Sequence, residues 1–256
     1  MENDQEIRLT AVTPANIDKT GFFCFRNRRS EEGYSRKKEW LLERFDEGLK
    51  IQLITEGGLG FIEYIPGEYA WRGVNADGYM FIHCLWVTGK RRNVGCGTAL
   101  LETCFRDARE TGKKGVAMIT SEGYFMMSKR FMLKHDFVSV ENYPPSFKLM
   151  VKKFEDAPDP SFTGNWDEKL AAFGEGLTVI TSDHCPHHAD AVNVCIETSK
   201  ELGVKYRIVE LKSSRDVREK SPSPFGTFGL VYNGKFVDHY TFNKKTFLKQ
   251  MAKVMK

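Results

Sequence analysis

Residues 87–98 read VTGKRRNVGCGT, and they join an apolar segment, residues 79–87, to an amphipathic segment, residues 95–110. The pattern predicts a buried strand, a basic loop and a helix that two glycines open. Gly95 and Gly97 let backbone N–H groups approach a ligand without obstruction by side chains. The start of a helix adds unpaired donors and positive dipole character. The segment therefore predicts a cradle for a pyrophosphate group.

The spacing separates this turn from other phosphate-binding loops. It has no Gly-Lys-Ser/Thr sequence, and it lacks the third glycine and the ribose-binding acid of a dinucleotide fold. No acidic residue occurs between Asp77 and Glu102, whereas Lys90, Arg91 and Arg92 lie within that window, so the local field favours an anion. One short basic cluster is too little for a nucleic-acid surface. We expect no nucleic-acid partner.

The same turn resembles a known family. Arg92 to Gly97 match the Q/R-x-x-G-x-G/A signature of the GNAT acetyltransferases, and Val87 stands five residues before Arg92, as the strand-ending valine of that family does. The resemblance covers about residues 5–154. It implies an α/β fold with a mixed sheet and flanking helices, and acetyl-CoA as the co-substrate.

The resemblance also implies which residues hold the cofactor. Main-chain amides of residues 92–98 would bind the pyrophosphate, and a splayed strand end would bond the pantetheine arm and orient the thioester carbonyl. These cofactor-binding residues are Leu85, Trp86, Val87, Arg92, Asn93, Val94, Gly95, Cys96, Gly97 and Thr98.

Hydrophobic periodicity gives the elements of this half of the chain. Strands are expected over residues 7–11, 51–55, 58–65, 79–87, 116–120, 137–140 and 147–154. Helices are expected after Thr13-Pro14 and over residues 31–49, 95–110 and 126–134. This order agrees with that of the acetyltransferase family.

Acetyl transfer requires groups that move protons, and three residues are candidates. His83 and Glu122 could take the proton of the amine, and Tyr124 could protonate the leaving thiolate. The usual acid of the family, a tyrosine, is replaced by Met132, and an asparagine of the same helix by Phe125. This departure leaves open a role in binding CoA without catalysis.

A substrate contact is expected in the Gly-rich loop between two strands, where this fold usually meets its acceptor. Arg72 could bind a carboxylate or phosphate of the acceptor there by a bidentate contact, and the alternative is an ordinary surface arginine.

The run EDAPDPS at residues 155–161 indicates a linker. We expect a GNAT domain over residues 1–154, a linker over 155–165 and a second domain over 166–256. The second domain resembles the YoaP-like domain that follows some GNAT domains, and more broadly a thioredoxin-like fold. It reads as strand 177–181, helix 189–202, strand 205–211, a hairpin across Asn233-Gly234 and helix 244–255.

Cys185 precedes the first helix of that domain, in the sequence CPHH. Since His188 stands where a thioredoxin carries its second cysteine, we expect a reactive thiol that does not cycle between dithiol and disulfide. A metal cluster with His184 and His187 is conceivable, but we expect no metal.

Composition limits the remaining classes. The chain has 256 residues, of which 41% are hydrophobic and 28% charged, and its six cysteines form no CxxC pair. No apolar run reaches the roughly 18 residues of a membrane span, so we expect a cytoplasmic protein without membrane partners. The oligomeric state is left open. The favoured function is acetylation of a primary amine on a small molecule or peptide. The alternatives are a non-catalytic CoA-binding sensor and a thiol-handling protein centred on Cys185.

Overall fold

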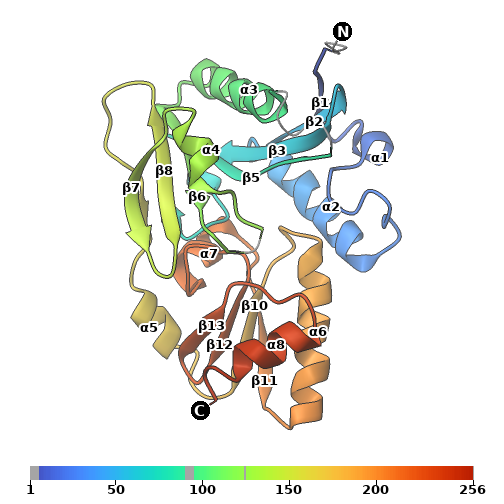
Figure 1. The fold of residues 1–256 in the computed structure, drawn as a ribbon, viewed down its shortest axis with the longest axis vertical. Coiled ribbons are helices and arrows are strands. Elements are labelled where there is room, and N and C mark those ends of the chain that lie inside the picture. The colour runs from blue at the N-terminus through green and yellow to red at the C-terminus, as the bar shows by residue number, and fades with distance from the viewer. Residues whose placement is uncertain (1–5, 90–94, 124, 256) are drawn as a thin grey trace. The chain divides into compact units, whose positions relative to one another are not determined.

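The computed structural model describes residues 6–89, 95–123 and 125–255 (Figure 1). Contacts between residues divide the chain into two compact units. The first unit comprises residues within 1–27, 41–70 and 75–161, and the second comprises residues 28–40, 71–74 and 162–256. Three elements contain residues of both units: α2 (Glu32–Phe45), β4 (Val74–Asn75) and β9 (Ser161–Phe162).

The first unit is built on a seven-stranded mixed sheet with the order β1-β2-β3-β5-β6-β8-β7. β5 and β6 run parallel, because α3 connects them, and the other neighbours in this sheet are antiparallel. Its strands are β1 (Arg8–Val12), β2 (Lys50–Glu56), β3 (Leu59–Pro66), β5 (Met80–Thr88), β6 (Gly115–Thr120), β7 (Val138–Tyr143) and β8 (Phe147–Lys153). Its helices are α1 (Ile17–Thr20), the 3₁₀ turn η1 (Gly67–Tyr69), α3 (Cys96–Glu110) and α4 (Lys129–Leu133).

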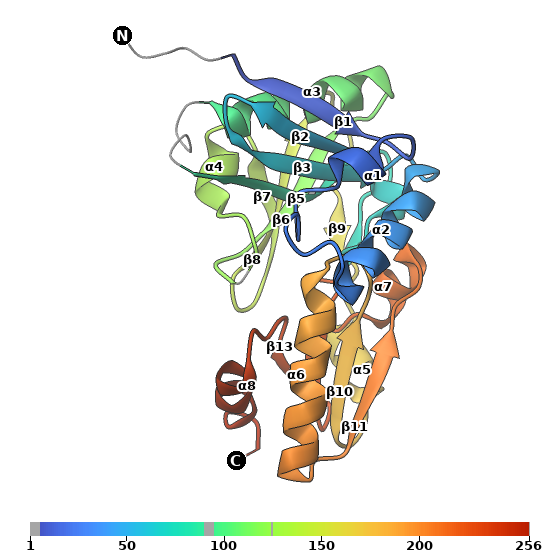
Figure 2. The same ribbon diagram turned by 90° about the vertical axis from the view of Figure 1, so that its right-hand side faces the viewer.

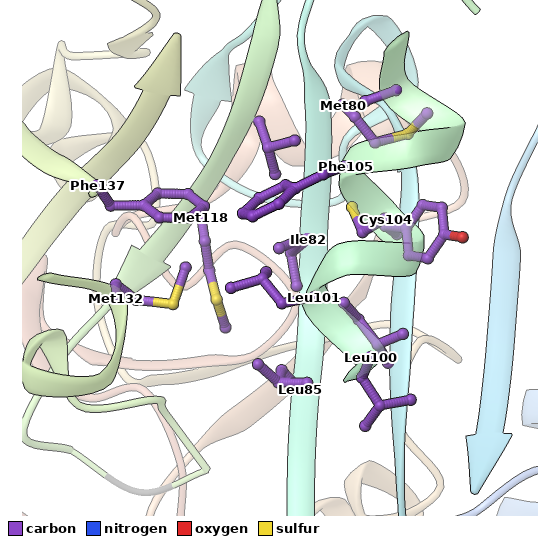
Figure 3. Close-up of a cluster of buried hydrophobic side chains, with 14 of the residues drawn as sticks. Met80, Ile82, Leu85, Leu100, Leu101, Cys104, Phe105, Met118, Met132 and Phe137 are labelled. Atoms are coloured by element: carbon purple, nitrogen blue, oxygen red, sulfur yellow. The ribbon is translucent and has the colours of Figure 1, made fainter. Parts of the chain in front are cut away.

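One face of this sheet forms the main core with α3 and α4 (Figure 3). The amphipathic pattern predicted for residues 95–110 is confirmed, because one face of α3 is buried: Leu100, Leu101, Cys104, Phe105 and Ala108. They pack on Met80, Ile82 and Leu85 of β5. Burial of one such large side chain stabilises the fold by roughly 1.5–3 kcal/mol. Because several of them pack on β5, this packing holds the start of α3 in place relative to that strand.

Strands β5 and β6 are paired over only part of their length. Their pairing ends at Ile82 opposite Met118, while β6 continues beside β8 and β5 continues beside β3 up to Thr88. The last residues of β5 therefore have a strand partner on one side only. A β-bulge lies at the point of separation, since Glu63 and Tyr64 of β3 oppose Cys84 and Ile82, which leaves His83 as the extra residue.

The second unit contains a separate four-stranded sheet with the order β11-β10-β12-β13. β10 and β11 are parallel, whereas β12 is antiparallel to both of its neighbours. α6 and α8 pack side by side (Figure 2). The elements are α5 (Trp166–Ala171), β10 (Leu177–Thr181), α6 (His187–Leu202), β11 (Tyr206–Glu210), α7 (Ser214–Lys220), β12 (Gly229–Tyr232), β13 (Lys235–Asp238) and α8 (Lys244–Met251).

The predicted element order of both halves is confirmed, with differences in extent. α4 begins at Lys129 instead of residue 126, because the Ser128 hydroxyl caps it by accepting from the Arg130 amide. Several short elements of the described residues were not predicted: η1, β4, β9, α5 and α7. None of the described helices is long and apolar enough to cross a lipid bilayer.

Candidate cofactor and active site

A cavity of about 690 Å³ opens between the separated end of β5 and the start of α3. Six of the residues predicted to bind the cofactor line it: Leu85, Trp86, Val87, Gly95, Gly97 and Thr98. The structure therefore brings the strand end and the glycine-opened helix together around one space. Arg92, Asn93 and Val94 lie outside the described residues.

The two glycines serve different geometric needs. Gly95 precedes α3 with φ +86, a left-handed conformation that residues with a Cβ rarely adopt. Gly97 lies against Phe131, and a Cβ built on it would come within 3.0 Å of the ring atom Cζ. Neither position tolerates a side chain without a local shift.

Cys96 presents only its main chain to this region. Its thiol is buried and points at the carbonyl of Gly57, with Sγ and the oxygen 3.7 Å apart. No acidic residue occupies the first turn of α3, so nothing there opposes an anion at the helix start.

The other half of the cavity wall was not predicted as a binding surface. It consists of Met126, Met127, Ser128, Phe131, Lys134 and His135. Met127 also packs against the core cluster. A possible signal is spacing, because Met127, Phe131, Lys134 and His135 recur at three or four residues.

His135 is the titratable ring in this wall. Its Nε2 lies 3.4 Å from the hydroxyl of Thr98, and its ring centroid lies 4.7 Å from that of Phe131. Partial burial lowers the pKa of His135 below its usual value, although Glu102 raises it in part. The imidazole is therefore neutral near pH 7.

His83 forms a buried pair with Glu63, a residue that the sequence did not single out. Nδ1 of His83 lies 3.2 Å from Oε1 of Glu63, and the two residues are 4% and 3% exposed. Glu63 could have been found, because a lone acid within the apolar run 61–65 needs a partner when it is buried. Neither residue lines the cavity, and His83 is the extra residue of the bulge in β5.

The remaining predicted catalytic residues are placed differently. Glu122 is exposed, and its amide donates to the hydroxyl of Ser146 at 3.1 Å. Tyr124 lies outside the described residues. Met132, at the position of the usual family acid, is fully buried in the core and has no proton to give.

Arg72 belongs to the second unit and is 5% exposed. Its guanidinium donates to the carbonyl of Trp71 at 3.2 Å and to the hydroxyl of Thr227 at 3.0 Å. The predicted contact with an acceptor anion would have to replace these internal bonds. The alternative of an exposed surface arginine is wrong, because the side chain is buried.

Cys185 lies between β10 and α6 and is half-buried. It lines a second, smaller cavity, which lies within the second unit and also includes His188. The main-chain N–H of His188 donates to the carbonyl of Cys185 at 3.0 Å, which closes the turn into α6.

Two family models match this chain. The model described as "Acetyltransferase (GNAT) family" matches residues 17–137, and the model described as "YoaP-like" matches residues 206–249. A protein of Bacillus subtilis (strain 168) named "Uncharacterized N-acetyltransferase YoaP" is 31% identical over 233 residues, which are 89% of this chain and 92% of that protein.

Solved structures of acetyltransferases are similar to part of the chain. A GNAT acetyltransferase of Staphylococcus aureus Mu50 covers 59% of this chain and 100% of its own, with 11% identity and a TM-score of 0.44. One of Brucella melitensis in complex with acetyl-CoA covers 61% of this chain and 96% of its own, with 16% identity and a TM-score of 0.37. These scores are too low to bear on function.

Proposed function

This chain belongs to the acetyltransferase (GNAT) family, and on that premise we propose that it moves the acetyl group of acetyl-CoA to a primary amine of a small molecule or peptide. One observation carries the proposal. The end of β5, which has a strand partner on one side only, and the start of α3, which two glycines open, line the same cavity. The strand end suits the pantetheine arm of acetyl-CoA, and the helix start suits its pyrophosphate.

The residues present suit acetyl-CoA, which would supply the activated acetyl group. Amides at the start of α3 would bind the pyrophosphate, and Gly97, which lines the cavity, adds no side chain there. The exposed edge of β5 at Leu85 and Val87 offers main-chain groups to the amides of the pantetheine arm. A main-chain N–H of this edge would polarise the thioester carbonyl as the amine attacks.

Proton transfer needs a base, and the pair of His83 and Glu63 is the best candidate. The carboxylate beside Nδ1 orients the ring and stabilises it once it has taken a proton. The amine proton would pass to Nε2 of His83, directly or through water. We keep Tyr124 as the proposed acid for the CoA thiolate and Glu122 as the alternative base.

We further propose that the second unit is thioredoxin-like and that Cys185 is a reactive monothiol. The support is the strand order, with a parallel pair β10 and β11, then β12 and β13 antiparallel, and the position of Cys185 where β10 leads into α6. The other cysteine of this unit, Cys195, lies buried within α6, and both are free thiols. Since all six cysteines are thiols, the reducing cytoplasm is the proposed location.

The decisive experiment measures acetyl-CoA binding and turnover with a panel of primary amines. Gly97→Asp would place a carboxylate where the pyrophosphate binds, so we expect calorimetry to detect no binding in a variant that remains folded. Unchanged affinity would refute the cofactor site. Binding without turnover of any amine would favour the CoA-binding sensor.

A further inference from the structure

The small cavity beside Cys185 has no part in the acetyl transfer proposed above. It measures about 60 Å³, and residues of the second unit alone line it. α2 forms one wall, and Gly33 permits its approach, since a Cβ there would come within 2.2 Å of the carbonyl oxygen of Pro186. The side chains that give the cavity its chemistry are Cys185, His188, Arg36, Glu32, Asp183 and Glu210.

His188 contributes a hydrogen-bond acceptor to the cavity. Its side chain is 2% exposed, and Nδ1 lies 2.9 Å from the carbonyl oxygen of Ser182. Because a carbonyl only accepts, Nδ1 carries the proton and Nε2 carries a lone pair. Burial lowers the pKa of His188 to about 3, so the ring is neutral. None of the hydrogen bonds among the described residues involves Nε2, and His188 lines the cavity, so this nitrogen is available to a ligand with N–H or O–H groups.

The rim of the cavity is acidic. Arg36 is surrounded by three carboxylates, with nitrogen-to-oxygen distances of 2.7 Å to Asp183, 3.3 Å to Glu32 and 3.7 Å to Glu210. One guanidinium offsets one of these three charges, and an excess of two negative charges remains. The rim therefore repels anionic ligands and favours a cation, above all one that can donate hydrogen bonds.

Cys185 adds sulfur chemistry to the cavity. Cys185 stands two residues before the first helical residue of α6, His187. Unpaired N–H groups at a helix start favour the thiolate form of a nearby cysteine. The cavity thus combines a nucleophilic sulfur, a neutral acceptor and an acidic rim.

We propose that this cavity binds small aminothiols, with the ammonium group between the rim carboxylates and Nε2 of His188 and the sulfur against Cys185. The disulfide form of such a compound would exchange with the protein. The thiolate of Cys185 attacks one sulfur, a new S–S bond forms, the old one breaks, and the departing half leaves as a thiol with the proton that Cys185 released. The disulfide is the only oxidant needed. The inference rests on the proposed reactivity of Cys185 and not on acetyl transfer.

The experiment measures mixed-disulfide formation on the full reduced chain by intact mass and peptide mapping. Three disulfides of similar length serve as probes: cystamine (cationic), bis(2-hydroxyethyl) disulfide (neutral) and 3,3′-dithiodipropionate (anionic). Each rate is divided by the rate of the same probe with a free cysteine peptide. We expect Cys185 to prefer cystamine over the neutral probe and the neutral probe over the anionic one. Cys185→Ser should lose the adduct, and Cys84→Ser, which removes another half-buried thiol, should keep it.

A second variant separates charge recognition from reactivity. Glu32→Gln combined with Glu210→Gln removes two exposed rim charges and leaves Cys185 in place. We expect the ratio of cationic to anionic rates to fall towards one in this variant. A ratio that is flat in the natural chain, or unchanged in the variant, overturns the aminothiol site. The rate of alkylation by iodoacetamide, a neutral reagent, tests the proposed reactivity of Cys185 separately from charge recognition. If Cys185 reacts no faster than Cys84 with any reagent, both proposals fall.

Discussion

At the scale of single residues, His83 and Glu63 illustrate the limits of sequence reasoning. His83 could be chosen because a histidine in an apolar strand near a cofactor turn is a natural base. Its partner could not be chosen by spacing, since Glu63 lies on a different strand, beside a bulge that shifts β5 by one residue. Register and bulges depend on the whole sheet.

We predict that His83→Ala lowers kcat by about 10²-fold or more, which is a common contribution of general acid–base catalysis. Glu63→Gln should lower kcat less and displace its pH profile, because it keeps the shape of the partner and removes the charge. The KM for acetyl-CoA should hardly change, since neither residue lines the cofactor cavity. Steady-state kinetics across pH test this.

The control is Glu68→Gln, which removes a carboxylate bonded to Lys113 elsewhere in the first unit. Urea unfolding of all three variants separates loss of catalysis from loss of stability. If His83→Ala and Glu63→Gln both retain kcat, the pair is a structural one and Glu122 becomes the next base to test.

A second residue-scale prediction concerns His135. Its lowered pKa means that it is neutral near pH 7 and gains a proton only as the pH falls below its ordinary value of 6.5. The protonated ring would then face the phosphates of the cofactor, and bound phosphates would raise its pKa in turn. We expect CoA affinity to rise a few fold as the pH falls through this range.

Calorimetry between pH 7.5 and pH 5.5 checks it, with His135→Gln as the matched control, because both proteins experience the same titration of the ligand phosphates. Parallel curves for the two proteins would show that His135 does not contact the cofactor.

At the scale of elements, strong local signals predicted most of the fold, and packing supplied the rest. The Asn233-Gly234 turn predicted the hairpin of β12 and β13, and the amphipathic pattern of residues 95–110 predicted a helix with one buried face. α7 was not predicted, although Ser213 caps it and Arg215 pairs with Glu219, because its sequence lacks an apolar stripe. The point at which the pairing of β5 and β6 ends depends on the whole sheet, so it cannot be predicted from the sequence of either strand alone.

The contact of α3 with α4 yields a prediction about the cofactor cavity. Alanine is favoured over glycine in a helix by about 1 kcal/mol, so Gly97→Ala should stabilise α3 if nothing stood in the way. Here the new Cβ meets Phe131 at 3.0 Å, and that ring lines the cavity. We expect weaker acetyl-CoA binding in Gly97→Ala and recovery in the double variant with Phe131→Leu. If Gly97→Ala binds normally by calorimetry, the ring has room to move and the clash is unimportant.

At the scale of the whole molecule, the resemblance to the GNAT and YoaP-like families is confirmed by the matching models and by the Bacillus relative. The linker at residues 155–165 remains a prediction. Contacts assign residues 28–40 and 71–74, which precede that linker, to the second unit. Such an assignment rests on contacts between residues far apart in the chain, which composition and periodicity do not record.

This division predicts what happens when the chain is shortened. A fragment of residues 1–160 keeps segments 28–40 and 71–74 but loses the part of the second unit that they contact. Trp40, 5% exposed, would lose the ring of His184, whose centroid lies 5.1 Å away, and Arg36 would lose Asp183. Trp40 and Trp71 would then become accessible to water. We expect the fragment to show red-shifted tryptophan emission, to bind ANS and to unfold with less cooperativity than the full chain.

The control is the full chain cleaved by a protease at a site inserted within residues 156–160. Cleavage there removes one peptide bond and leaves every one of those contacts available, so we expect the two pieces to elute together and keep buried tryptophan emission. The second unit would be held by α2 and residues 71–74 of one piece packing with residues 162–256 of the other. Pieces that separate on a column, or a 1–160 fragment that matches the full chain in emission and cooperativity, would show that the linker divides two independent domains. The comparison thus tests whether the second unit folds from the residues after the linker alone or also needs segments 28–40 and 71–74, which precede it.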